Sequence, residues 1–191
     1  MMRFVRPAAV MAALLLGACT HTFEVPQSTL AKSAATAERS DAVAALVVTP
    51  DLRAAKWSES MMGDTFEAPL GDALIAGAKQ LLLDMFSTVE VVPTPGGISK
   101  ALYYVAPTML RIEHTQAAWA FGEQVFTMAV EWRVTDRDGQ TVLVDTIISE
   151  GRGRQGNVFT YKGDTKTTLG RLINDTFAKA EGKLSPVLRH S

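Results

Sequence analysis

The sequence predicts an α+β domain with a mixed, mostly antiparallel sheet of four or five strands and two helices packed on one face. Helical apolar periods over residues 66–86 and 165–184 indicate the two helices. Apolar alternation between residues 102 and 150 indicates three consecutive long strands. The element order is therefore β-α-β-β-β-β-α, and its first strand–helix–strand unit predicts a parallel pair joined by a right-handed crossover.

The first strand and the first helix are separated by a stretch without a clear period. Residues 43–48 form a short apolar run stopped by Pro50, which predicts a buried strand. Residues 51–65 are interpreted as a loop. From 66 to 86, apolar residues recur at spacings of three and four, which predicts a helix with Pro69 in its first turn.

The middle of the chain predicts the sheet. Residues 88–92 are interpreted as a strand that ends at the Pro- and Gly-rich stretch 93–97, and residues 102–113 as a second strand. The alternation is clearest over 124–134. Its apolar face holds Phe126, Met128, Val130, Trp132 and Val134. Since this face should turn toward the core, Trp132 is expected to be buried between the sheet and a helix.

A hairpin and the last helix complete the domain. The Asp-Gly pair at 138–139 supplies the positive φ that a tight turn requires. The returning strand is expected over 142–150, and the Gly-rich, polar residues 151–164 are interpreted as a connection. The final helix, 165–184, is expected to end at Pro186.

The start of the chain has the layout of an export signal. Arg3 and Arg6 precede the apolar run 8–16, which is about half the length needed to cross a bilayer. The following Leu-Gly-Ala-Cys, ending at Cys19, resembles the lipobox of bacterial lipoproteins. That resemblance implies cleavage before Cys19, the only cysteine in the chain, and its acylation by chains such as palmitate. The alternative is an ordinary secretory signal with a stray cysteine.

These features divide the chain into a signal peptide (1–18), a flexible tether (19–41) and a single αβ domain (42–191). Thr20 rather than Asp follows Cys19, which implies sorting to the outer membrane with the domain facing the periplasm. The formal net charge is −1, so the sequence has no electrostatic footprint for nucleic acid.

The element order after a lipobox resembles a group of envelope lipoproteins whose αβ domain is similar to the N-terminal domain of TolB. The group includes YajG-type lipoproteins, penicillin-binding-protein activators, the curli-secretion lipoprotein and exopolysaccharide-export lipoproteins. The resemblance rests on the architecture over residues 42–185 and on the phrase from Trp132 to Gly139. Auxiliary lipoproteins of ABC-type lipid transport and lipopolysaccharide-assembly lipoproteins are a second resemblance. Neither one implies particular functional residues.

Few residues indicate chemistry, and no metal or cofactor motif is present in the sequence. Glu113-His114 could act as an acid–base or ligand pair, although an exposed strand end is the expected alternative. The stretch 151–156 holds Arg152 and Arg154 between glycines. It could bind an anionic glycan, a lipid phosphate or an acidic protein surface, or it could simply connect two elements.

The expected function is that of a non-catalytic lipoprotein, held to the membrane by its lipid, which binds or assembles another envelope component. Recognition is expected at the loops 57–64 and 119–122 and at the basic stretch 151–156. The residues expected to contact a protein or glycan partner are Trp57, Trp119, Phe121, Arg152 and Arg154.

Two alternatives stay open at this point: an accessory role in lipid or lipopolysaccharide transport, and a small envelope enzyme. An oligomer is compatible with each reading. An open sheet edge beside Val142–Ile148 would favour binding by strand addition. A deep apolar cavity would favour lipid handling. A buried polar cluster with shifted pKa values would favour the enzyme.

Overall fold

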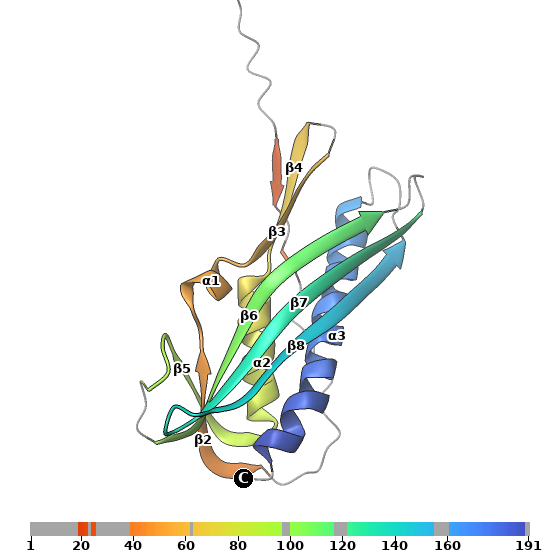
Figure 1. The fold of residues 1–191 in the computed structure, drawn as a ribbon. Coiled ribbons are helices and arrows are strands. Elements are labelled where there is room, and N and C mark those ends of the chain that lie inside the picture. Colours follow the sequence, from red (N-terminus) through yellow and green to blue (C-terminus); the bar gives the residue numbers. More distant parts are fainter. Residues whose placement is uncertain are drawn as a thin grey trace, which may run out of the picture.

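The computed structural model describes residues 19–22, 24–25, 39–61, 63–96, 100–116, 122–154 and 161–189. In this part of the chain a five-stranded sheet has the order β5-β2-β6-β7-β8, and a three-stranded sheet has the order β1-β4-β3 (Figure 1). The strands are β1 (Thr20–Thr22), β2 (Ser40–Val47), β3 (Lys56–Met61), β4 (Asp64–Pro69), β5 (Phe86–Val92), β6 (Ala101–Gln116), β7 (Glu123–Asp136) and β8 (Thr141–Arg154). The helices are α1 (Pro50–Arg53), α2 (Gly71–Leu83) and α3 (Tyr161–Leu188).

The five-stranded sheet is the α+β arrangement that the sequence predicts. β2 pairs in parallel with β5, across the α2 crossover, and also with β6. The long strands β6, β7 and β8 pair antiparallel and make up most of the ladder. The turn between β7 and β8 is the expected tight one: Gly139 has a φ of 77°, and the Asp136 carboxylate accepts from the backbone N–H of Gln140 at 2.8 Å.

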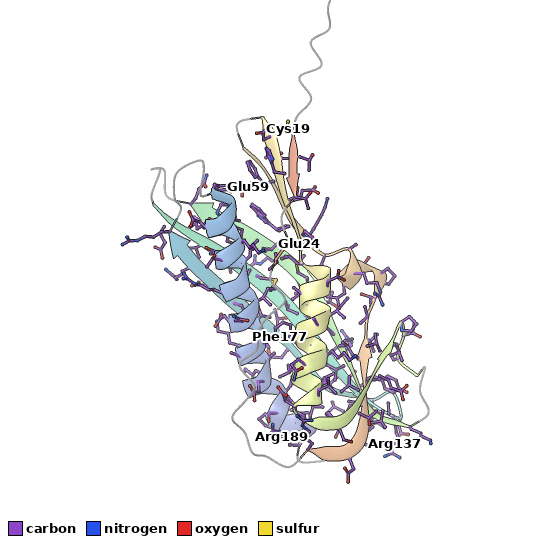
Figure 2. All side chains as sticks on the ribbon, turned by 180° about the vertical axis from the view of Figure 1, so that it is seen from behind. Cys19, Glu24, Glu59, Arg137, Phe177 and Arg189 are labelled. Atoms are coloured by element: carbon purple, nitrogen blue, oxygen red, sulfur yellow. The ribbon has the colours of Figure 1, made fainter. Side chains whose placement is uncertain are left out.

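The core lies between this sheet and the two long helices, which cover the same face (Figures 1 and 2). Trp132 of β7 is buried and meets Phe177 of α3 edge-on, with ring centroids 6.0 Å apart. The predicted apolar face of β7 is therefore confirmed. Phe177 also packs directly against Gly77 of α2, because a Cβ atom added at Gly77 would clash with its ring.

The expectation that residues 51–65 form a loop is wrong. Pro50–Arg53 form the short helix α1, whose first turn is capped by the Thr49 hydroxyl, and a β-hairpin of β3 and β4 follows. Its strands were missed because their faces mix polar and apolar residues rather than alternating cleanly. Pro69 ends β4 instead of opening α2, which begins at Gly71.

β1 lies within the segment 19–41, for which a flexible tether was expected. Thr20–Thr22 pair in parallel with Thr65–Glu67 of β4, and Val25 is buried. Three residues paired with a strand more than forty positions away leave no local pattern to read. The expected signal peptide, 1–18, lies outside the described residues.

Element boundaries toward the end of the chain also differ from the expectation. Residues 151–154, interpreted as part of a connection, belong to β8. The last helix runs through Pro186 to Leu188. A proline is tolerated there because the helix is about to end, and the N–H of Arg189 still bonds to the Ser185 carbonyl at 3.1 Å.

Candidate functional site

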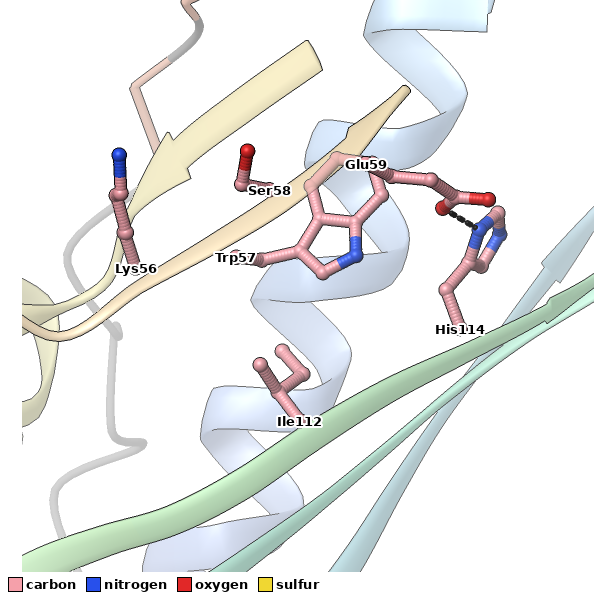
Figure 3. Close-up of a pocket in the computed structure, with 6 residues that line it drawn as sticks. All are labelled: Lys56, Trp57, Ser58, Glu59, Ile112 and His114. Atoms are coloured by element: carbon pink, nitrogen blue, oxygen red, sulfur yellow. Dashed lines mark hydrogen bonds and ion pairs between the residues drawn. The ribbon is translucent and has the colours of Figure 1, made fainter. Parts of the chain in front are cut away.

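The three-stranded sheet presents a polar outer face and an aromatic inner face. On the outer face, the Lys56 ammonium lies 2.7 Å from the Glu67 carboxylate, to which the Ser58 hydroxyl also donates. The bond from Lys56 lowers the pKa of Glu67. Trp57 and Glu59 lie on the other face of β3, toward β6 (Figure 3). The hairpin therefore lays one aromatic ring and one carboxylate over the long sheet.

His114 of β6 meets both of these side chains. Its Nδ1 lies 2.5 Å from the Glu59 carboxylate (Figure 3). The ring stacks on Phe126, its cross-strand neighbour, with centroids 4.2 Å apart, and Trp57 packs edge-on at 5.6 Å. Only 2% of the His114 side chain is exposed, against 29% for Glu59. We name the four residues Trp57, Glu59, His114 and Phe126 the hairpin junction.

The geometry of the hairpin junction fixes the role of the imidazole. Nδ1–H donates to Glu59, while Nε2 is buried and has no hydrogen-bond partner among the described residues. The His114–Glu59 pair therefore joins the hairpin to β6.

The expectation that residues 113–114 form an exposed strand end is half correct. Glu113 is exposed and pairs with Arg111 at 3.2 Å. His114 points the opposite way, into the hairpin junction. Its burial depends on a hairpin that lies more than fifty residues earlier in the sequence.

A shallow hollow of about 400 Å³ opens beside the junction, lined by Lys56, Trp57, Ser58, Glu59, Ile112 and His114. Tyr161, at the start of α3, is close to Glu59, and burial together with that negative charge raises the pKa of its phenol to about 12. Phe66 packs edge-on against the Tyr161 ring at 5.1 Å. The small sheet is thus attached to both β6 and α3.

A second hollow, of about 710 Å³, lies at the end of β8 and is lined by Glu123, Arg152, Gly153, Arg154 and Arg171. Arg152 donates to the carboxylates of Glu150 at 2.9 Å and Glu123 at 3.3 Å, which raises its pKa. Arg171 of α3 donates to the Arg152 carbonyl at 2.7 Å. These arginines are therefore held on a strand and a helix rather than on a loose connection.

The structure separates the residues expected to contact a partner. Trp57 is 3% exposed and packs in the hairpin junction, so its indole is part of the core rather than a contact surface. Arg152 and Arg154 are exposed on β8. Trp119 and Phe121 lie outside the described residues.

Cys19 is exposed and stands immediately before β1 (Figure 2). Its backbone carbonyl accepts from the N–H of Thr65 in β4 at 3.0 Å. The expected lipidation site is therefore held against the three-stranded sheet. Among the described helices, none is both long and apolar enough to cross a bilayer.

A row of α3 side chains along the free edge of β8 was not anticipated. Arg171, Asp175, Lys179 and Lys183 recur every fourth residue and so share one face of the helix. Asp175 accepts from the backbone N–H of Glu150 at 3.0 Å, and Lys179 donates to the Ile148 carbonyl at 3.1 Å. The spacing was visible in the sequence, but its target could not be known before the helix was placed.

No protein-family model matches the chain, and no curated protein matches it in sequence. Solved structures share its fold. Protein XCC0632 of Xanthomonas campestris, a DUF330 protein, has a TM-score of 0.53 at 11% identity, covering 88% of this chain and 99% of its own. The minor lipoprotein of Acinetobacter baumannii has a TM-score of 0.50 at 14% identity, covering 78% and 94%.

Hypothetical protein CT253 of Chlamydia trachomatis has a TM-score of 0.51 at 13% identity, covering 80% of this chain and 100% of its own. At such identities the likeness extends to the fold alone. The domain thus has the fold of a class that includes a bacterial lipoprotein, which is consistent with an envelope lipoprotein.

Proposed function

We propose that this chain is an outer-membrane lipoprotein, anchored through acyl chains on Cys19, whose periplasmic domain binds another envelope component without catalysing a reaction. The lipobox-like motif supports the anchor, and the fold shared with a minor lipoprotein supports the class. Thr20 after the cysteine supports outer-membrane sorting.

The position of Cys19 carries this proposal. Its thiol is exposed, and its carbonyl is bonded to Thr65 at the start of the folded domain. A lipid attached there leaves the chain beside the small sheet without disturbing the core. Two or three acyl chains anchor a protein stably, since each buried methylene contributes about 0.8 kcal/mol.

A binding role is supported by what the two hollows offer. The hollow at the end of β8 presents Arg152 and Arg154, which suit an acidic protein surface or an anionic glycan. At the other hollow the His114 imidazole is buried, while the Glu59 carboxylate is partly exposed. The hollow at the end of β8 is lined mainly by charged side chains, and the hollow beside the hairpin junction is shallow, so neither gives particular support to lipid transport.

Fractionation of cells tests the anchor. Cys19→Ser should appear in the soluble periplasmic fraction or remain as uncleaved precursor, whereas Thr20→Ser, a change of similar size next to it, should stay with the outer membrane. Mature Cys19→Ser protein that still sediments with the outer membrane would overturn the lipid anchor.

Crosslinking in the native envelope tests the binding role. Replacing both Arg152 and Arg154 by Gln should weaken adducts with the partner, while Arg133→Gln, a change at an arginine paired with Glu131 on the same sheet, should leave them unchanged. If every arrangement of crosslinker on the domain gives no adduct, the binding role is wrong.

A further inference from the structure

The free edge of β8 is protected along only part of its length. β8 ends the five-stranded sheet, with β7 as its single neighbour in the described chain. The backbone groups of Ile148, Glu150 and Arg152 point away from β7. Side chains of α3 occupy them: Lys179 on the Ile148 carbonyl, Asp175 on the Glu150 N–H and Arg171 on the Arg152 carbonyl.

The α3 side chains stop covering the backbone of β8 at Lys183. Lys183, the next residue of the row, lies 3.3 Å from the side-chain carboxylate of Asp145 instead of bonding to the backbone. The ladder with β7 is regular from Arg154 back to Leu143. Alternate residues of a strand point their N–H and C=O groups the same way, so Thr146 and Val144 also face the free edge.

These edge groups have no hydrogen-bond partner among the residues that the structure describes. Their side chains lie on the sheet face opposite the helices, and Val144 is 46% exposed and Val142 41%. Natural proteins blunt free edges with proline, lysine or covering elements. The stretch Thr141–Thr146 contains no proline or lysine, and its pairing with β7 shifts register only between Thr141 and Leu143. The next stretch is covered by α3. We name Thr141–Thr146 the open edge.

We propose that the open edge binds an extended segment of a partner protein, which joins the sheet as an added strand beside β8. This inference rests on the proposed binding role and specifies the kind of partner. Donors and acceptors that alternate along a strand edge are matched by another extended backbone. A helix cannot match them because its backbone groups are hydrogen-bonded internally, and a lipid has no such alternating groups. The register shift between Thr141 and Leu143, together with the α3 side chains from Ile148 onward, limits regular pairing to residues 143–147.

The added strand should carry apolar residues at alternate positions. Val144 exposes its side chain on the sheet face opposite the helices, so a partner side chain lying beside it would bury apolar surface there. The partner is therefore a protein with an exposed, alternating extended segment.

The test uses a photo-crosslinking residue at position 144 of the full-length lipidated chain in its native envelope. Thr146→Pro removes an edge N–H that does not pair with β7, and proline is accepted at such positions. This variant should keep its melting temperature within a few degrees and lose at least tenfold of the adduct. Thr146→Ala, which keeps the N–H, should retain the adduct.

A second measurement does not depend on how the variant folds. In the complex of the full-length lipidated chain with the protein that the position-144 adduct identifies, amide hydrogen exchange at Val144 and Thr146 should slow at least tenfold. Gln140, whose N–H is already bonded to Asp136, should change little. Unchanged exchange at both edge amides would overturn the proposal.

The remaining outcomes separate the two proposals. Adducts at position 154 that persist in Thr146→Pro, with none at 144, would overturn strand addition and leave the binding role intact. An adduct of twice the chain's own mass would replace the partner with a second copy of this chain. Absence of adducts from both positions would count against the binding role itself.

Discussion

The ring of Phe177 occupies the space that a side chain at Gly77 would need. A Cβ atom there would lie 2.1 Å from one ring carbon and 2.4 Å from another. The same ring meets Trp132 edge-on. One aromatic side chain of α3 therefore packs against both α2 and β7.

We expect Gly77→Ala to destabilise the domain by about 1–3 kcal/mol, because the added methyl forces Phe177 to move in a close-packed core. Gly182→Ala is the control. Gly182 is an exposed helical glycine, and a Cβ atom added to it would meet nothing within 4 Å, so alanine there should stabilise by about 0.5–1 kcal/mol. Urea unfolding measures both. Equal effects would show that Phe177 does not constrain α2.

Trp132→Ala should lower the free energy of unfolding by about 3–5 kcal/mol, the usual cost of truncating a large buried aromatic residue. Trp132→Phe should cost less, because it retains a ring that can meet Phe177. Thermal unfolding followed by circular dichroism checks both. An unchanged melting temperature for Trp132→Ala would place the indole on the surface and shift the register of β7.

Glu59 and His114 should be energetically coupled. In a double-mutant cycle of Glu59→Gln and His114→Phe, which keeps an aromatic ring on Phe126, we expect a coupling of about 1–3 kcal/mol, as for hydrogen bonds to charged groups. Arg111 and Glu113 provide the comparison on the same strand. Both are 59% exposed, so their coupling should be close to zero. Similar couplings for the two pairs would contradict the hairpin junction.

Tyr161 should make stability depend on alkaline pH. Its folded-state pKa is raised to about 12, whereas an exposed phenol titrates near 10. The unfolded chain therefore loses its proton first, and the Tyr161 contribution is intact below pH 10 and falls as the pH rises toward 12. Comparing wild type with Tyr161→Phe across this range isolates the effect. Parallel pH profiles would show that the phenol is not buried in the folded state.

The five-stranded sheet could be predicted because its signals are local. The alternation along β7 identified the buried face that holds Trp132, and the Asp-Gly pair placed the turn before β8. The three-stranded sheet could not be predicted in the same way. β1 has three residues and pairs with a strand far along the chain, and β3 places a charged residue, Glu59, on an inner face where an apolar one would be expected.

The candidate site residues were likewise predictable only where the signal is local in the sequence. Arg152 and Arg154 were expected to be accessible, and they are, but on a strand rather than a loop. Trp57 looked like a contact residue because its segment had no period, and it is buried only because the hairpin folds over Phe126. The half-protected edge of β8 depends on the rotation of α3 about its axis, which a single sequence does not specify.

The pairing of β1 with β4 has a mechanical consequence. If Cys19 is held in a membrane, a force on the domain acts along the three paired residues that follow it, and such a short ladder yields before the long strands do. Once it yields, Val25, which is buried in the core, is the next described residue that holds the chain. A pull at Cys19 would therefore act first on the pairing of β1 with β4 and only afterwards on the core, so the short strand shields the five-stranded sheet from that force.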